Sequence, residues 1–154
     1  DLIISGEIFK QISALLEPGL KSGDLVSSGS VVIGTVADDI HEIGKNIVIT
    51  MLKSSNFEVV DLGANVAPEK FVEALGDTGA GVLGLSGLLT LAFDSMRETV
   101  EAVRDAGLAG RVKVMIGGGP VDENIRKLVG ADDWGADAQA AVRLARLWSE
   151  QAHV

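Results

Sequence analysis

The stretch VVIGTVADDIHEIGKNIVITML, residues 31–52, decides the fold class of this chain. It opens with the apolar run VVIGTV, which is typical of a strand covered on both faces of a sheet. It closes with apolar residues at the spacing of one helix face, which are Ile43, Ile47, Val48, Met51 and Leu52. An acidic loop that contains His41 lies between the two. The pattern indicates a strand, a loop and a helix, which is the repeating unit of a parallel sheet.

Four more units of the same kind follow along the chain. Each starts with a short apolar run that precedes a segment of helical periodicity, and the runs are FEVVDLG (57–63), GVLGLS (81–86), VKVMIG (112–117) and the weaker ADDW (131–134). Strands that alternate with helices need crossover connections, which make a parallel sheet with helices on both faces. The sequence therefore predicts an α/β fold with a doubly wound, five-stranded parallel sheet of the flavodoxin-like or Rossmann-like type.

The first 29 residues differ from the rest. A short amphipathic pattern stops at Pro18 and consists of Ile8, Ile12, Leu15 and Leu16, and a polar, linker-like stretch follows it. We expect residues 1–29 to be the remnant of a larger N-terminal helical module with its linker. Residues 30–154 are expected to form the α/β domain.

Charge and composition exclude several classes of function. The chain has 13 basic and 22 acidic side chains and a net charge of −9, which argues against direct binding of nucleic acid or of anionic membranes. The sequence has no cysteine, which excludes disulfides, thiolate metal ligands and cysteine nucleophiles. No apolar stretch approaches the roughly 20 residues of a membrane span, and no export signal is evident. We expect a cytoplasmic protein.

The loops that follow the first, third and fourth strands, at residues 37–44, 86–90 and 117–120, share the edge where such sheets bind ligands. A dinucleotide site or a P-loop would need glycine-rich motifs that the first loop lacks. The acidic pair Asp38 and Asp39 suits a phosphoacceptor receiver domain, but the third strand ends in Ser86 where that domain needs a carboxylate. These readings are disfavoured by the chemistry of the loops rather than by the fold.

His41 is open to two interpretations from the first loop alone. Residues two apart in an extended loop project to the same side, so Asp39 can hold one ring nitrogen and leave the other to bind a metal. A single protein ligand suits a metal whose other positions are filled by a macrocycle. The alternative is a solvated histidine near the start of a helix, which the D-x-H pattern alone favours.

Three motifs in order settle this choice. Asp39, His41 and Gly44 form D-x-H-x-x-G, Ser86-Gly87-Leu88 forms S-x-L, and a Gly-Gly pair follows the fourth strand. Together they resemble the cobalamin-binding domain of methionine synthase and of the corrinoid proteins in methanogenic and acetogenic methyltransferase systems. The resemblance covers roughly residues 30–150.

The resemblance implies a role for each matching residue. His41 would replace dimethylbenzimidazole as the lower axial ligand of cobalt, in the base-off, His-on mode, with Asp39 hydrogen-bonded behind it. Gly44 would leave room for the nucleotide tail. The other residues implied in cofactor binding flank the corrin edge, the base slot or the tail, and are Asp38, Glu42, Ile43, Ser86, Leu88, Thr90, Gly117, Gly118 and Ala138.

The resemblance also implies a function. The chain would bind cobalamin and carry a methyl group between partner methyltransferases, from a methyl donor to tetrahydrofolate or a thiol, with a reductive activator as a further partner. It would be a subunit or domain of such a system and not a complete enzyme alone. Two alternatives remain, a regulatory or light-sensing cobalamin module and the cobalamin domain of an adenosylcobalamin-dependent mutase. Ile43 stands where mutases commonly carry arginine, which favours the methyl carriers.

Overall fold

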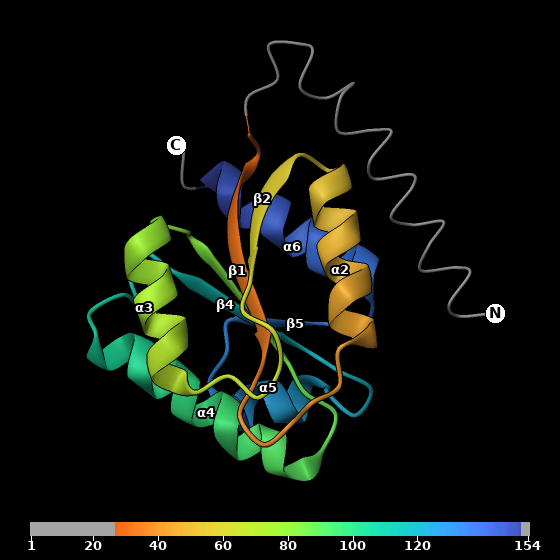
Figure 1. The fold of residues 1–154 in the computed structure, drawn as a ribbon, viewed down its shortest axis with the longest axis vertical. Helices are drawn as coiled ribbons and strands as arrows, with labels where there is room; N and C mark the ends of the chain where they lie inside the picture. The colour runs from red at the N-terminus through yellow and green to blue at the C-terminus, as the bar shows by residue number, and fades with distance from the viewer. Residues whose placement is uncertain (1–26, 152–154) are drawn as a thin grey trace, which may run out of the picture.

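A parallel sheet of five strands forms the centre of the computed structural model, which describes residues 27–151 (Figure 1). The strands are β1 (Gly29–Thr35), β2 (Phe57–Asp61), β3 (Val82–Ser86), β4 (Lys113–Gly117) and β5 (Asp133–Gly135). Their order in the sheet is β2-β1-β3-β4-β5, the order of flavodoxin-like folds. The predicted fold class is therefore confirmed, with strand ends that differ from the predicted ones by no more than two residues.

Helices cover both faces of this sheet (Figure 1). One face carries α2 (Ile43–Ser54) and α6 (Ala138–Gln151), and the other carries α3 (Pro68–Thr78), α4 (Thr90–Asp105) and α5 (Glu123–Val129). Local signals set the ends: Pro68 lies in the first turn of α3, and the Asp122 side chain caps α5 by accepting a hydrogen bond from the Ile125 N–H. None of the helices within residues 27–151 is long and apolar enough to cross a membrane.

The expected N-terminal helical remnant falls on residues 1–26, which lie outside the described part of the chain. The first strand begins at Gly29, and its start packs against the last turns of α2 and α6. Ser28 donates its hydroxyl to the carbonyl of Ser55, and a Cβ at Gly29 would collide with Ser149. The chain therefore enters the α/β domain at the end of the sheet opposite the strand-end loops.

Two hydrophobic cores lie on opposite faces of the sheet, because successive side chains of a strand point to opposite sides. Val32 and Leu83 are fully buried in the core beneath α3, α4 and α5. Ile33 and Met115 belong to the core beneath α2 and α6. Each helix layer is held by this burial, which contributes roughly 1.5–3 kcal/mol for each large apolar side chain.

The strand order reverses between β1 and β3, which places the loops after β1, β3 and β4 at one edge. The backbone N–H of Val36 donates to the carbonyl of Ser86 over 3.1 Å, and that of Gly87 donates to the carbonyl of Gly117 over 3.1 Å. These bonds join the three loops side by side beyond the ends of their strands. The edge predicted to bind a ligand is therefore one continuous surface.

Candidate cofactor site

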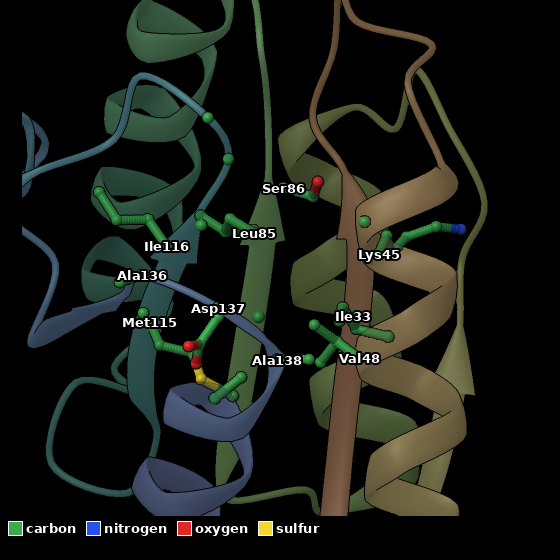
Figure 2. Close-up of a pocket in the computed structure, with 17 residues that line it drawn as sticks. Ile33, Lys45, Val48, Leu85, Ser86, Met115, Ile116, Ala136, Asp137 and Ala138 are labelled. Carbon is green, nitrogen blue, oxygen red and sulfur yellow. The ribbon is translucent and has the colours of Figure 1, made fainter.

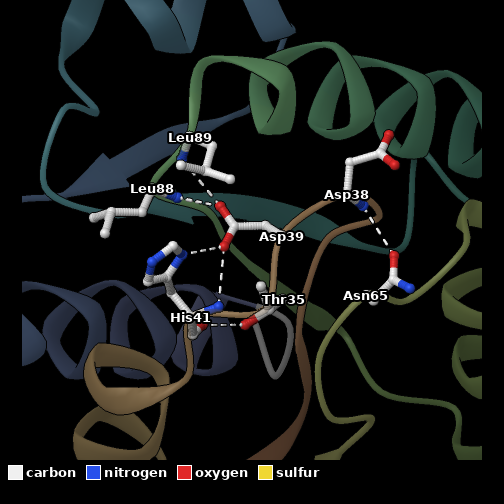
Figure 3. Close-up of polar contacts among 7 residues, drawn as sticks. All are labelled: Thr35, Asp38, Asp39, His41, Asn65, Leu88 and Leu89. Carbon is white, nitrogen blue, oxygen red and sulfur yellow. Dashed lines mark hydrogen bonds and ion pairs between the residues drawn. The ribbon is translucent and has the colours of Figure 1, made fainter.

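The Asp39 carboxylate organises the loop between β1 and α2 (Figure 3). Its side chain is fully buried, and Oδ1 accepts hydrogen bonds from the backbone N–H of His41 at 3.0 Å and from the ring, with Nδ1 at 2.6 Å. The second oxygen, Oδ2, accepts the backbone N–H groups of Leu88 at 2.6 Å and Leu89 at 3.0 Å. One carboxylate thus joins the loop after β1 to the loop after β3.

These bonds set the protonation of both side chains. Burial raises the pKa of Asp39, but the hydrogen bonds from the backbone of Leu88, His41 and Leu89 and from the His41 ring outweigh it, so the pKa lies well below its ordinary value. An ionised carboxylate can only accept, so Nδ1 of His41 carries the ring proton. The other nitrogen, Nε2, then keeps its lone pair and faces away from Asp39 (Figure 3). The half-exposed His41 ring therefore already has the tautomer and the orientation that a metal ligand needs.

The backbone of the same loop is held from two further sides. Thr35 at the end of β1 donates its hydroxyl to the carbonyl of His41 over 2.8 Å. Asn65 receives the N–H of Asp38 on its Oδ1 at 2.9 Å and donates its own N–H to the Asp39 carbonyl at 2.9 Å. Asp38 and Asn65 both have positive φ, at 70° and 52°, a conformation that persists only where its surroundings impose it. The loop that carries His41 is therefore shaped before any ligand arrives.

Lys45, in the first turn of α2, is among the largest fully buried side chains of residues 27–151. Its Nζ lies 2.8 Å from Oε1 of Glu42 and 2.7 Å from Oδ1 of Asp61, and the two carboxylates are 43% and 41% exposed. The buried ammonium thus ties the residue after His41 to the end of β2. Desolvation of this charge is offset only while both carboxylates remain in place.

We expect Lys45→Met to lower the free energy of unfolding by about 2 kcal/mol. This loss is smaller than the loss expected when one partner of a fully buried ion pair is removed, because water can solvate Glu42 and Asp61 once the ammonium is gone. Urea denaturation measures the change, with the exposed Lys53→Met in the same helix as the matched control. An unchanged midpoint in Lys45→Met would show that the buried charge stabilises nothing.

A cavity of about 240 Å³ opens beside this loop, between the sheet and helices α2 and α6 (Figure 2). Its lining is dominated by small residues, among them Gly44, Gly84, Ser86, Gly117, Gly118, Gly119, Gly135, Ala136, Ala138 and Ala141. Strands β1, β3, β4 and β5 form its floor, and the first turns of α2 and α6 form its walls. A narrow group that enters from the strand-end loops fits this shape.

The register of the sheet explains why the cavity is open. Cross-strand neighbours share a face, and one row of the face toward α2 and α6 consists of Ile33, Gly84 and Met115. The next row toward the loops consists of Ser86, Gly117 and Gly135. A Cβ at Gly84 would press on the Ile33 side chain at 3.2 Å, whereas the nearest atom to a Cβ at Gly117 is the Gly135 carbonyl oxygen at 3.8 Å, so the open space lies over Gly117.

Gly118 has a separate reason to be glycine. Its φ is +145°, and a Cβ there would collide with the carbonyl oxygen of Gly87 in the neighbouring loop. The Gly-Gly pair thus combines an open position over the cavity at Gly117 with a close backbone contact at Gly118.

Apolar side chains surround His41 at the surface. Ile40 is 74% exposed and Ile43 is 68% exposed, both in the loop that carries the histidine or just after it. Leu88, Leu89 and Leu91 are also exposed on the adjoining loop and helix start. Exposed apolar residues gathered at one edge mark a binding surface rather than ordinary solvent contact.

The structure brings the residues predicted from sequence together in two groups. Five line the cavity, namely Gly44, Ser86, Gly117, Gly118 and Ala138. The others lie in the surrounding loops or at the first residue of the helix that follows, namely Asp38, Asp39, His41, Glu42, Ile43, Leu88 and Thr90. Leu88, expected to line the slot, lies outside the cavity lining and supplies its backbone N–H to Asp39 instead. Glu42, expected at the corrin edge, binds Lys45.

Several residues of the site were missed by sequence reasoning. Gly84 had a usable signal, because glycine inside a strand often marks the close approach of a ligand. Thr35, Lys45 and Asn65 had none, since their partners lie on other elements and become neighbours only through folding.

Comparisons with known proteins bear on this site. A family model described as "B12 binding domain" matches residues 29–143. The chain is 41% identical over 132 residues to "Dimethylamine corrinoid protein 3" of Methanosarcina acetivorans, covering 86% of this chain and 62% of that protein. It also matches the crystal structure of a "novel cobalamin-binding protein" from Desulfitobacterium hafniense, with a TM-score of 0.81 and 44% identity over 96% of this chain and 69% of the other.

A further structural match is the "methanol:cobalamin methyltransferase complex MtaBC" from Methanosarcina barkeri, with a TM-score of 0.77 and 27% identity over 84% of this chain and 50% of that one. The chain therefore spans about half to two thirds of the length of these proteins. The residues described above correspond only to the matched parts of those proteins.

Proposed function

This chain belongs to the B12-binding domain family, and from that premise we propose that it holds a corrinoid through His41 and carries a methyl group between partner methyltransferases. The resemblance and the cofactor class predicted from the three motifs are confirmed by the family match. The observation that carries the residue assignment is the His41 ring, held by the buried Asp39 beside a cavity lined by glycine and alanine.

The residues present fit a corrinoid with its nucleotide tail. His41 offers a neutral Nε2, and Asp39 fixes the tautomer that leaves this atom free. The cavity offers space over Gly117, which lacks a side chain, and the exposed Ile40 and Ile43 offer apolar surface beside His41. The cobalt of a bound corrinoid supplies the centre that accepts and releases the methyl group.

The partners in this proposal are methyltransferases that deliver the methyl group and remove it. The similarity to a dimethylamine corrinoid protein and to one chain of a methanol:cobalamin methyltransferase complex supports such partners. We also propose a reductive activator as a further partner and a cytoplasmic location, in keeping with the absence of cysteine from the chain.

The cofactor part of the proposal is tested by adding hydroxocobalamin, removing the excess by gel filtration, and recording the absorption spectrum. We expect the wild-type chain to keep the corrinoid with a spectrum that reports imidazole ligation. His41→Ala should lose that signature, whereas His153→Ala, which changes the other histidine of the chain, should keep it. A colourless wild-type protein would contradict cofactor binding, and an unaltered spectrum in His41→Ala would contradict the ligand role.

The carrier part is tested by loading the chain with methylcobalamin and adding a thiol with a corrinoid-dependent thiol methyltransferase. We expect the spectrum to change only when both are present, because a carrier passes its methyl group to a partner. A chain whose oligomeric state changes on illumination, and whose methyl group is not transferred, would instead be a light-sensing module.

A further inference from the structure

We propose that the cavity beneath α2 and α6 selects corrinoids by the base of their nucleotide tail, favouring a substituted benzimidazole over a purine. The inference rests on the proposed function, because it assumes that a corrinoid is held by His41. The inference goes beyond the proposed function by naming the class of corrinoid that the chain binds.

The deeper part of the cavity is walled by apolar side chains. Ile33 on β1 and Met115 on β4 are both buried, at 4% exposure, and they face Val48 of α2 and Ala141 of α6. Leu85 and Ile116 also line the cavity, but their side chains belong to the core on the other face of the sheet, so they contribute backbone. An aromatic ring that enters this part therefore meets hydrocarbon on both sides.

Three polar side chains line the cavity, namely Lys45, Ser86 and Asp137. Nζ of Lys45 is held by Glu42 and Asp61 and points away from the cavity (Figure 2). Oδ1 of the exposed Asp137 accepts the backbone N–H of Ala140 at the start of α6, which leaves its Oδ2 as an acceptor near the strand-end loops. Within the described part of the chain, the half-buried Ser86 is the lining side chain that offers a hydroxyl without a protein partner.

The backbone N–H and C=O groups of the strands that form the floor also have hydrogen-bond partners. The strands that form it are paired through continuous parallel ladders from β1 to β5, which use the N–H and C=O groups between them. Polar groups of a ligand find partners near the loops, at the side chains of Ser86 and Asp137 and at the backbone of Gly118, Gly119 and Ala136. The cavity is thus polar at its mouth and apolar in its depth.

This gradient matches a nucleotide tail that has a polar ribose phosphate and an apolar base. Dimethylbenzimidazole carries two methyl groups and one uncommitted ring nitrogen, for which Ser86 offers one donor. Adenine carries an exocyclic amino group and additional ring nitrogens, and it lacks the methyl groups. Among Ile33, Val48 and Met115 these polar atoms would lose water without gaining a partner, which disfavours the purine.

The test compares three corrinoids on the wild-type chain by spectroscopic titration. They are cobalamin, an adenine-containing cobamide, and cobinamide, which has no nucleotide. We expect the adenine form to bind about 10- to 100-fold more weakly than cobalamin, because a mismatched polar group in an apolar pocket typically has an effect of this size. Equal loss of affinity with adenine and with no nucleotide at all would also support the inference, since both ligands leave the apolar walls unfilled.

A substitution in the cavity floor provides a second, independent test. Met115→Gln places an amide among the apolar walls, and we expect it to lower the preference for cobalamin over the adenine form by about tenfold. Met51→Gln, which changes a half-buried residue of α2 outside the lining of this cavity, is the matched control and should leave the preference unchanged.

A preference below about tenfold in the wild-type chain overturns the inference while leaving the proposed function intact. If no corrinoid, including cobinamide, gives a spectral change that depends on His41, the proposed function fails and the inference fails with it. Should Met115→Gln not fold, the wild-type comparison decides alone.

Discussion

Asp39→Asn is expected to move the ring proton of His41 from Nδ1 to Nε2 and so remove the free nitrogen that binds cobalt. All four neighbours of the carboxylate are donors: the backbone N–H groups of His41, Leu88 and Leu89 and the Nδ1–H of the ring. In this variant the amide oxygen can accept the backbone N–H groups of Leu88 and Leu89 only if the amide NH₂ group faces His41. That group must then donate to Nδ1, which forces the other tautomer.

Nitrogen-15 NMR of the imidazole measures the tautomer in the free protein. The same variant should bind cobalamin about 10- to 100-fold more weakly, the usual effect of removing the group behind a metal-bound histidine. It should also lose about 2 kcal/mol of stability, because the N–H of His41 faces a donor. Asp77→Asn is the matched control, since the Asp77 carboxylate is exposed near the end of α3 and outside this network. A proton that stays on Nδ1 in Asp39→Asn would contradict the account.

Gly117→Val is expected to weaken cobalamin binding by about 100-fold or more without unfolding the protein. Gly117 ends β4 with a φ that any residue adopts, and the nearest atom to a Cβ there is the Gly135 carbonyl oxygen at 3.8 Å. A Cβ therefore finds room at this position, and valine suits a strand. It fills the row between Ser86 and Gly135 that leaves the cavity open.

Titration with cobalamin and with cobinamide separates this effect from a general loss of binding. Cobinamide has no nucleotide to place in the cavity, so Gly117→Val should change its affinity much less. Gly81→Val, at the opposite end of the sheet beside the Arg111 carbonyl, is the matched control and should bind both corrinoids like the wild type. Equal affinity of Gly117→Val and the wild type for cobalamin would show that the tail does not occupy this cavity.

Much of the fold was predictable from local pattern. The alternation of short apolar runs with helical periodicity from residue 31 onward predicted five strands and their helices, and the structure has them. Such periodicity reflects which face of each element is buried, and burial repeats every two residues in a strand and every 3.6 in a helix. The three motifs added the family, because they occur in order after the first, third and fourth strands.

The site needed more than the motifs. Asp39 appeared from sequence as a partner of His41, two residues away, and this short-range contact is present. Its bonds to Leu88 and Leu89, nearly 50 residues along the chain, depend on the pairing of β1 with β3. Lys45 gave no signal in the sequence, and the position of Asp61 at the end of the neighbouring strand pairs its buried charge.

The sequence by itself determined the order of elements, the identity of the histidine and its carboxylate, and the family, since each depends on residues close together in the chain or on a motif. The tertiary structure alone decided where the cavity lies and what its walls are made of. Ser86, Gly117 and Gly135 come from three strands, and they line one opening only because the register of the sheet aligns them in one row on the face beneath α2 and α6. Register is a property of strand pairing, which no single stretch of the chain encodes.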